Sequence, residues 1–207
     1  HGYNLIKQYD LKEDAEYLGK LFINYQSDKY THGYEIIYAY VSNILLKKNN
    51  IKKVLEFGLG TKDPKMPSTM AFGKVDNIVG GSLRAWRDYF PNAKIYGADI
   101  DKATLFQEER IETHFVDSLE QRTLDNLLVT IGGEFDVMID DALHYPNANL
   151  NSLLFALRAL KIGGVLVIED ISERMLSFWQ MIGCILPKTY GYKIIKSDHF
   201  MVVVQKK

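Results

Sequence analysis

Residues 135–170 decide the fold, and they read FDVMIDDALHYPNANLNSLLFALRALKIGGVLVIED. Two apolar runs rich in β-branched residues, 137–139 and 165–168, show too little alternation for half-exposed strands. Between them, leucines recur at helical spacing over residues 150–160, and Gly163-Gly164 predicts the end of that helix. The segment therefore predicts a βαβ crossover with two buried, parallel and adjacent strands.

Both predicted strands end in a pair of acidic residues, Asp140-Asp141 after the first and Glu169-Asp170 after the second. The carboxyl ends of parallel strands meet at one edge of the sheet, which is where such folds bind ligands. Four carboxylates gathered there repel one another unless they bind a cation or take up protons. A hard divalent ion held by oxygen ligands is the simplest partner, and His144 follows close by.

The composition is that of an ordinary globular protein. The chain has 207 residues, of which 47% are hydrophobic and 25% charged, so it suits one α/β unit with its own core. A formal net charge of -1 gives no electrostatic reason to expect nucleic acid or an anionic membrane as partner. The single cysteine, Cys184, excludes an internal disulfide framework and favours a reducing, cytoplasmic location. We expect no signal peptide and no membrane span, because no apolar stretch approaches roughly 20 residues.

The first part of the chain, residues 1–50, predicts a helical segment that packs with residues 51–207 as one compact unit. Residues 11–25 and 33–48 carry the apolar spacing of helices. The polar and aromatic stretch 27–34 lies between them and is either a plain connector or a lid over the carboxylates. The side chains that such a lid would bring are Asp28, Lys29, His32 and Tyr34.

A glycine-containing loop, Gly58-Leu59-Gly60, follows the predicted strand 53–57. The two glycines permit a sharp turn and the close approach of a ligand. A dinucleotide fingerprint needs a third glycine at position 63, where Asp63 would instead repel a pyrophosphate. The fingerprint also requires an acidic residue roughly 20 residues after the glycine motif. Here the next predicted strand, 94–99, places Asp99 about 40 residues after it. A ligand without phosphates suits the loop better, and a nicotinamide-dependent oxidoreductase is the rival interpretation.

The remaining patterns complete a seven-stranded sheet. Residues 62–81 are either a long loop over the ligand-binding edge of the sheet or a disordered insertion. Ser82 is expected to cap a helix over 82–90. Further predicted elements are helices over 101–109, 119–129 and 173–186, a strand over 112–116, and an antiparallel hairpin over 192–195 and 200–205. The predicted fold class is α/β, a Rossmann-like three-layer α/β/α sandwich with a mostly parallel sheet and an antiparallel last strand.

Together, the glycine loop and the acids at successive strand ends resemble the class I S-adenosylmethionine-dependent methyltransferases over most of residues 51–207. In that family the acid of the second strand binds the ribose, and a carboxylate can accept hydrogen bonds from two neighbouring hydroxyls. The cofactor-binding residues that the resemblance implies are Glu56, Gly58 and Gly60 for the methionine part, Asp99 for the ribose, Asp117 and Ser118 near adenine, and Asp140, which lies either at the cofactor or behind the metal ligands.

A narrower resemblance is to the metal-dependent sugar O-methyltransferases of macrolide antibiotic synthesis and to related enzymes of surface polysaccharide synthesis. The motifs that carry it are Asp-Asp-x-x-His, Glu-Asp and the Ser-Asp-Lys at 27–29. The insertion at 62–81 and the short amino-terminal region depart from that pattern. The site residues it implies are Asp141, Glu169 and Asp170 as ligands of Mg²⁺ or another hard divalent cation, with Asp141 and His144 as catalytic residues and His144 as the base.

The implied function is methyl transfer from S-adenosyl-L-methionine to a hydroxyl of a sugar or nucleotide-linked glycan, in antibiotic, capsule or lipopolysaccharide synthesis. A phosphate or phosphoramidate group on the same glycans is an alternative acceptor, and a non-catalytic cofactor-binding protein is an alternative class. Paired acids at strand ends are also common caps, and a histidine after a strand is commonly structural. The absence of a basic stripe and of an Asn-Pro-Pro-Tyr motif argues against nucleic acid as substrate. The oligomeric state is left open, a homo-oligomer included.

Overall fold

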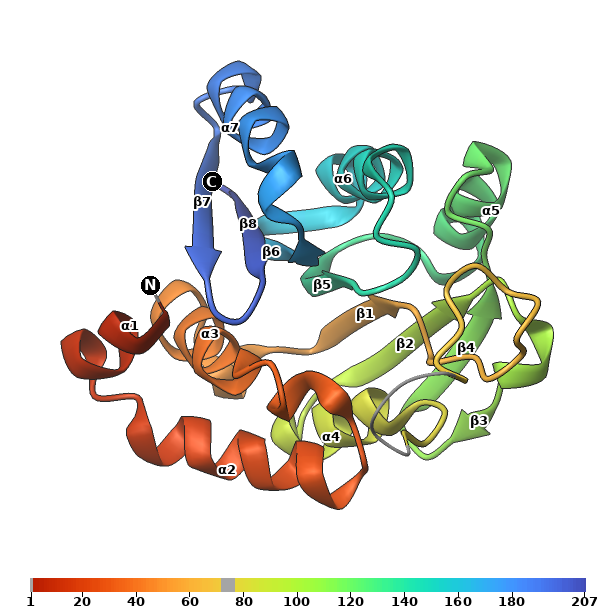
Figure 1. The fold of residues 1–207 in the computed structure, drawn as a ribbon, viewed down its shortest axis with the longest axis horizontal. Coiled ribbons are helices and arrows are strands. Elements are labelled where there is room, and N and C mark those ends of the chain that lie inside the picture. The colour runs from red at the N-terminus through yellow and green to blue at the C-terminus, as the bar shows by residue number, and fades with distance from the viewer. Residues whose placement is uncertain (1, 72–76) are drawn as a thin grey trace.

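A mixed sheet forms the middle layer of the protein, whose computed structural model describes residues 2–71 and 77–207 (Figure 1). Across the described residues the sheet has eight strands in the order β3-β4-β2-β1-β5-β6-β8-β7. The strands are β1 (Lys53–Phe57), β2 (Lys94–Asp99), β3 (Gln107–Glu108), β4 (Ile111–Phe115), β5 (Phe135–Asp140), β6 (Leu160–Ile171), β7 (Tyr190–Lys196) and β8 (Phe200–Lys206). The strands β4, β2, β1, β5 and β6 are parallel, whereas β8 runs antiparallel to β6 and to β7.

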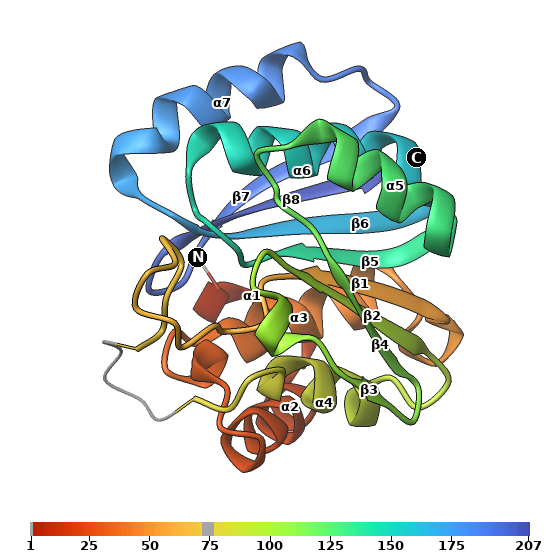
Figure 2. The same cartoon turned by 90° about the vertical axis from the view of Figure 1, so that its right-hand side faces the viewer.

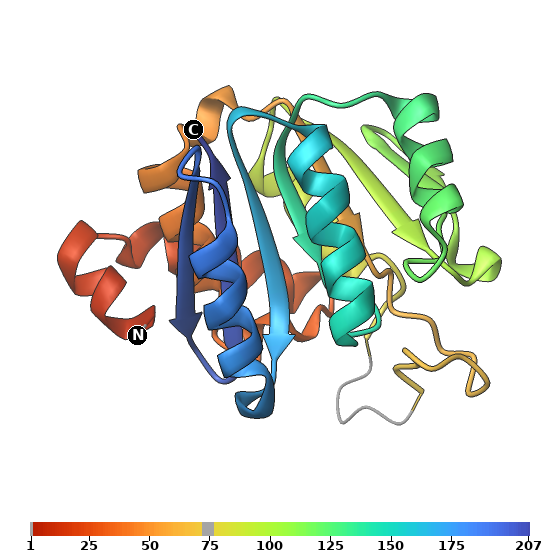
Figure 3. The same ribbon diagram turned by 90° about the horizontal axis from the view of Figure 1, so that it is seen from above.

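Helices cover both faces of the sheet, which gives the predicted three layers (Figures 1 and 2). One face carries α1 (Gly2–Tyr9), α2 (Lys12–Asn24), α3 (Tyr34–Tyr40) and α4 (Gly81–Tyr89). The other carries α5 (Gln121–Ile131), α6 (Pro146–Ala159) and α7 (Leu176–Ile185), which lie side by side in Figure 3. Short turns of 3-10 helix are η1 (Asp28–Tyr30), η3 (Lys48–Asn50), η4 (Lys102–Thr104) and η5 (Glu173–Met175), and η2 (Val41–Leu45) is a π-helical turn.

Each face of the sheet has its own buried apolar cluster, because successive side chains of a strand point to opposite faces. In β1, Val54 packs with the amino-terminal helices, while Leu55 and Phe57 pack beneath α5 and α6. Glu56 follows the same alternation and points toward the amino-terminal helices. The strand is therefore buried on both faces, as its nearly continuous apolar sequence predicts.

The order of the strands fixes where a ligand can bind. The chain builds outward from β1 through β2 to β4 and then returns to place β5 on the other side of β1. The edge beyond the carboxyl ends of β1 and β5 is therefore the switch point, the usual ligand site of such sheets. Phe57 is in register with Asp140, and Asp140 with Ile168. The residues that follow these three positions consequently meet at one edge.

The sequence predicted most of these elements, including the βαβ crossover and the antiparallel hairpin. The predicted helix over 101–109 is wrong: it is the short turn η4 followed by β3. The Asp101 carboxylate accepts the backbone N–H of Ala103 and stabilises a single turn, after which the chain pairs with the edge of β4. This added edge strand makes eight strands in place of seven.

Three helix boundaries also differ from the prediction. Helix α6 ends at Ala159, before Gly163-Gly164, because Leu160 adopts an extended conformation and pairs with Phe135 at the start of β6. Helix α3 ends at Tyr40 and continues as a π-helical turn to Leu45. Ser82 lies inside α4, and the residue that precedes the helix is Gly80, whose φ of 68° is left-handed. Among the described residues, no helix combines the length and apolar character needed to cross a membrane.

Candidate active site

A cavity of about 320 Å³ lies beyond the carboxyl ends of the central strands. Its volume falls within the range of small-molecule sites, about 300–1,000 Å³. Five of the predicted cofactor residues line it, namely Gly58, Gly60, Asp99, Asp117 and Ser118. The same cavity is lined by Asp141, His144 and Asp170. The structure thus brings the predicted cofactor loop and most of the predicted metal and base residues to one enclosed space.

Gly58 is required by the contact between the glycine loop and the strand end that carries Asp141. Its φ is 98°, and a Cβ added there would lie 2.0 Å from the carbonyl oxygen of Asp141. The backbone N–H of Gly58 donates to the carbonyl of Ala98 at 2.8 Å, which ties the loop to β2. Glycine at this position therefore lets β1, β2 and β5 deliver their ends to the same cavity.

Asp99 both lines the cavity and holds the glycine loop. Its Oδ2 accepts the backbone N–H of Leu59 at 2.7 Å, and its Oδ1 accepts that of Asp101 at 2.8 Å. Burial raises the pKa of the Asp99 carboxyl, and these backbone hydrogen bonds oppose that rise. A carboxylate fixed in this way presents its remaining lone pairs to the cavity, as a ribose-binding residue must.

The side chain of Lys29, which comes from η1, lies among the carboxylates. Its Nζ lies 2.6 Å from Asp141 Oδ2, 2.7 Å from Glu169 Oε2 and 3.0 Å from Glu56 Oε1, and the residue is 1% exposed. Burial disfavours its charge, but the attraction of Asp141, Glu169 and Glu56 outweighs burial and raises the pKa of Lys29 well above its usual value. Lys29 therefore supplies one positive charge to a group of three acids.

Two tyrosines of α3 reach the acids at the end of β6. Tyr34 Oη donates to Asp170 Oδ1, and Tyr38 Oη donates to Glu169 Oε1. Burial, followed by the nearby carboxylates, raises the pKa of both phenols, so each remains a donor at neutral pH. Tyr38 was not among the residues predicted from the sequence, although its i+4 spacing from Tyr34 places both side chains on one face of the helix.

Asp141, His144 and Asp170 form a compact group of potential metal ligands. Their ligand atoms all lie within 4.8 Å of one another, and His144 Nε2 is 3.7 Å from Asp141 Oδ1 and 3.5 Å from Asp170 Oδ2. His144 and Asp170 both have a left-handed backbone, with φ of 56° and 55°. Non-glycine residues adopt that conformation at a cost, and such strained residues gather at functional sites.

The two carboxylates of this group fit a hard divalent cation, because Mg²⁺ and Mn²⁺ prefer oxygen ligands. Glu169, the third predicted metal ligand, lies elsewhere in the same acid cluster. Its two oxygens are occupied by Lys29 and Tyr38, and the side chain is 1% exposed. The structure therefore places Glu169 behind Asp141 and Asp170, where it holds Lys29.

Two predicted cofactor residues do not reach the cavity. Glu56 is fully buried, and its Oε2 accepts the indole N–H of Trp86 at 2.6 Å while Oε1 faces Lys29. Asp140 is also buried, and Asn149 of α6 donates to its Oδ2 at 2.9 Å. Alternation along β1 and β5 directs Glu56 toward the amino-terminal helices and Asp140 toward α6, and neither side chain lines the cavity.

The predicted lid and the long insertion are brought to the cavity only in part. Ser27 and Asp28 line the cavity, whereas His32 pairs with Asp198 outside it. Of the stretch 62–81, residues 67–70, 77–78 and 81 contribute to the wall. Residues 72–76 of that stretch lie outside the described residues.

Comparisons with known proteins find sugar O-methyltransferases among the similar sequences and methyltransferases among the similar structures. The MycE methyltransferase of the mycinamycin pathway, solved with Mg and SAH, superposes with a TM-score of 0.70 at 26% identity, covering 91% of this chain and 54% of that one. This chain resembles the sugar O-methyltransferases. The tetracenomycin rhamnosyl 2'-O-methyltransferase of Streptomyces olivaceus is 29% identical over 167 residues, and the mycinamicin VI 2''-O-methyltransferase of Micromonospora griseorubida is 36% identical over 126 residues.

The extent of the resemblance is uneven. The two relatives are matched over 80% and 60% of this chain, but the matched part is 40% and 28% of their own length. The chain thus spans less than half of the curated sugar O-methyltransferases it resembles. More distant structures, such as human methyltransferase-like protein 13 with SAH (TM-score 0.55, 18% identity), share the fold. No protein-family model matches the sequence.

Proposed function

We propose that this chain is an O-methyltransferase that uses S-adenosyl-L-methionine and a divalent cation, Mg²⁺ first, to methylate a hydroxyl group of a sugar or glycan precursor. The observation that supports the proposal is the single cavity that joins Gly58, Gly60 and Asp99 to Asp141 and His144. The resemblance to enzymes solved with Mg and SAH supports the choice of cofactors.

When bound, S-adenosyl-L-methionine supplies the methyl group, and a divalent ion makes a coordinated hydroxyl more acidic. The chain contributes position and proton transfer. Asp141 and Asp170 would hold the cation, Asp99 would accept the ribose hydroxyls, and the backbone at Gly58 and Gly60 would admit the methionine part. Much of the rate enhancement would then come from the arrangement of the reactants.

His144 would remove the proton of the acceptor hydroxyl. Its imidazole lies between two carboxylates, with Nε2 3.7 Å from Asp141 and 3.5 Å from Asp170. Its Nε2 would accept that proton as the hydroxyl oxygen bonds to the methyl carbon and the bond between that carbon and the cofactor sulfur breaks. The products are then the methyl ether, S-adenosylhomocysteine and a proton carried by His144.

The acceptor follows from the resemblance alone, because the sequence relatives act on sugars of tetracenomycin and macrolide compounds by name. A MycE structure also contains mycinamycin VI. We propose that the acceptor is a glycan precursor of capsule, lipopolysaccharide or antibiotic synthesis in a bacterial cytoplasm. A nucleotide-linked sugar is the form to test first. A phosphate or phosphoramidate acceptor on such glycans is the alternative outcome of the same screen.

The test is methyl transfer from labelled S-adenosyl-L-methionine to a panel of nucleotide-activated sugars and glycosides, before and after exhaustive chelation. We expect label in a sugar product, loss of turnover after chelation and recovery with Mg²⁺. The variant His144→Ala should lose turnover by at least about 100-fold while its thermal midpoint still rises with S-adenosylhomocysteine.

The matched control is His114→Ala, since His114 lies on β4 beside Glu112 and away from the cavity. It should keep full turnover. Activity that survives chelation would remove the metal from the mechanism, and full activity of His144→Ala would remove the base. A thermal midpoint raised by NAD and unchanged by S-adenosylhomocysteine would favour the oxidoreductase, because only a ligand of the native state stabilises it.

A further inference from the structure

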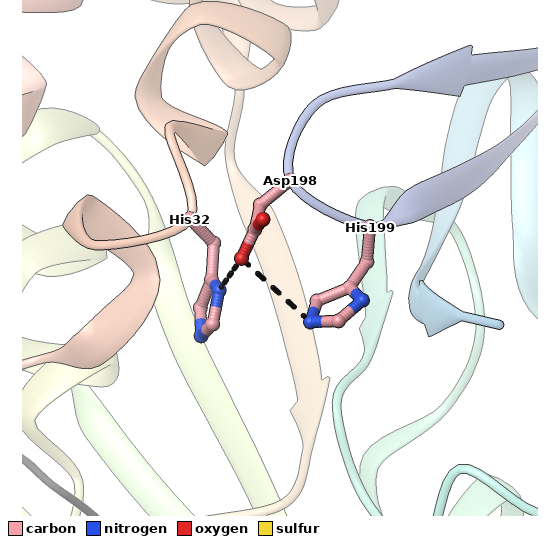
Figure 4. A group of neighbouring side chains, drawn as sticks. All are labelled: His32, Asp198 and His199. Carbon is pink, nitrogen blue, oxygen red and sulfur yellow. Dashed lines mark hydrogen bonds and ion pairs between the residues drawn. The ribbon is translucent and has the colours of Figure 1, made fainter.

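A second group of metal-binding side chains lies where the turn between β7 and β8 meets the loop in front of α3. His32, Asp198 and His199 offer two imidazole nitrogens and a carboxylate oxygen within 4.8 Å of one another. Figure 4 shows both rings directed at the same carboxylate. His32 Nδ1 lies 2.9 Å from Asp198 Oδ2, and His199 Nε2 lies 3.7 Å from the same oxygen.

These separations match the size of a zinc site. Zinc bonds of about 2.0–2.2 Å at tetrahedral angles place neighbouring ligand atoms roughly 3.4 Å apart. The two measured separations fall on either side of that value, so small side-chain rotations would seat an ion. Two imidazoles and one carboxylate are also a softer set than the two carboxylates and one imidazole at the cavity, and they leave a fourth position open.

The backbone holds the two ligand-bearing segments together. Ser197 Oγ donates to the carbonyls of His32 and Gly33 at 2.7 and 3.2 Å, and the N–H of Asp198 donates to the carbonyl of His32 at 3.4 Å. Gly33 has a φ of 68°, and a Cβ there would come within 3.0 Å of Ser197 Oγ. The approach of the two segments is therefore built into the fold, so a cation finds its ligands already gathered.

We propose that His32, Asp198 and His199 bind a divalent cation of the zinc class at a site separate from the methyl-transfer cavity. All three side chains reach solvent, so the ion can enter without unfolding. The ion fastens the β7–β8 turn to the loop whose next residues reach the cavity. The His32 ring packs against Tyr34 with centroids 5.3 Å apart, and Tyr34 donates to Asp170. An ion bound at this second site therefore restricts the movement of His32 and of the Tyr34 ring that packs against it.

The test is a titration of the metal-free protein with Zn²⁺ against a chromophoric chelator, in excess Mg²⁺ so that the hard oxygen ligands at the cavity are occupied. We expect one zinc per chain. His32→Gln and His199→Gln should each weaken zinc binding at least tenfold, because each removes a direct ligand. Metal-free thermal midpoints of these variants should stay close to that of the wild type, since the substituted side chains are at the surface.

Two control variants separate this site from other histidines. His114 lies on β4, and His114→Gln should keep the zinc affinity of the wild type. His144 lies at the cavity, and His144→Gln should keep the same zinc affinity. Failure of the wild type to bind zinc in excess Mg²⁺ would overturn the proposal. So would zinc binding that disappears in His144→Gln and persists in His199→Gln, because the ion would then occupy the cavity. Neither result depends on whether the chain transfers methyl groups.

Discussion

Lys29 places one positive charge among Asp141, Glu169 and Glu56, and its own side chain is 1% exposed. Burial raises the pKa of Glu56 and Glu169, so these acids are costly to ionise without a cation beside them. Lys29 therefore has the role of a permanent internal counter-ion. It also leaves Asp141 Oδ1 free to face His144.

Replacing Lys29 by methionine keeps the apolar length of the side chain and removes its charge. The expected result is a loss of about 3–5 kcal/mol in the free energy of unfolding, because the buried carboxylates lose their partner. Urea denaturation followed by circular dichroism measures it. The control is Lys12→Met on α2, because the Lys12 side chain is 73% exposed and pairs with Glu16 on the surface. This variant should change stability by less than about 0.5 kcal/mol. Equal stability of the two variants would contradict the proposed role of Lys29.

Gly58 offers a second test at a single position. Alanine there has to adopt a left-handed backbone, which costs about 1–2 kcal/mol, and its Cβ would also collide with the Asp141 carbonyl. Gly163 shares the backbone requirement, with φ of 86°, but has no atom within 4 Å of an added Cβ. We expect both alanine variants to lose stability, and only Gly58→Ala to lose affinity for S-adenosylhomocysteine, by at least tenfold in calorimetry. Intact affinity in Gly58→Ala would show that the loop can move away from Asp141 at no cost to the site.

Single residues also show the limit of sequence reasoning. The acids, His144 and the two glycines could be predicted because they follow apolar strands at a fixed edge of the sheet. The lid alternative for residues 27–34 brought Lys29 near the carboxylates, but its partners Asp141 and Glu169, 112 and 140 residues away along the chain, could not be predicted. The burial of Glu56 likewise depends on Trp86 of α4, which no local pattern around β1 indicates.

Among the elements, α3 contributes more to the site than its amphipathic pattern suggests. Its first and second turns present Tyr34 and Tyr38 to the end of β6. The helix therefore orients the Asp170 and Glu169 carboxylates from outside the sheet. In metal sites, groups that hydrogen-bond to the ligands set their orientation and basicity, and Tyr34 would act in this way on Asp170 at the proposed cation site.

Tyr34→Phe tests that role of α3. Loss of the hydrogen bond to Asp170 should weaken Mn²⁺ or Mg²⁺ binding by about 10–100-fold, the usual effect of removing a group that supports a metal ligand. Tyr89→Phe is the matched control, because its hydroxyl donates to Asp14 and lies away from the cavity. Calorimetric titration of both variants gives the comparison. An unchanged affinity in Tyr34→Phe would mean that Asp170 keeps its orientation unaided or does not bind the ion.

The elements divide clearly into those that the sequence predicts and those it does not. Buried strands β1, β2, β5 and β6 carry strong apolar runs and lie where these runs predict them, although β6 begins at Leu160, before its predicted range of 165–168. The edge strand β3 has two residues and no apolar pattern, so it forms only because β4 offers an unpaired edge. The end of α6 was misplaced for a related reason: pairing of Leu160 with Phe135 stops the helix before the glycine signal is reached.

For the whole molecule, the division of the chain into residues 1–50 and 51–207 as one compact unit stays a prediction, and the cores suggest how to test it. The amino-terminal helices and one face of the sheet share a buried cluster that contains Phe22, Tyr38 and Trp86. The opposite face has a second cluster that contains Trp179. Each cluster therefore holds one of the two tryptophans of the chain.

Single-tryptophan variants can report on the two faces separately. Trp179→Phe leaves Trp86, whose ring lies 5.0 Å from Phe22 and 4.7 Å from Tyr38 between centroids, and Trp86→Phe leaves Trp179, which α7 buries against the opposite face of the sheet. If the chain is one cooperative unit, the urea midpoint from fluorescence should equal the midpoint from circular dichroism within each variant. Comparing two signals within one variant removes the effect of the substitution on stability. An earlier fluorescence midpoint for Trp86 alone would show that residues 1–50 unfold first, and the acid cluster would then lose Lys29, Tyr34 and Tyr38 before the sheet unfolds.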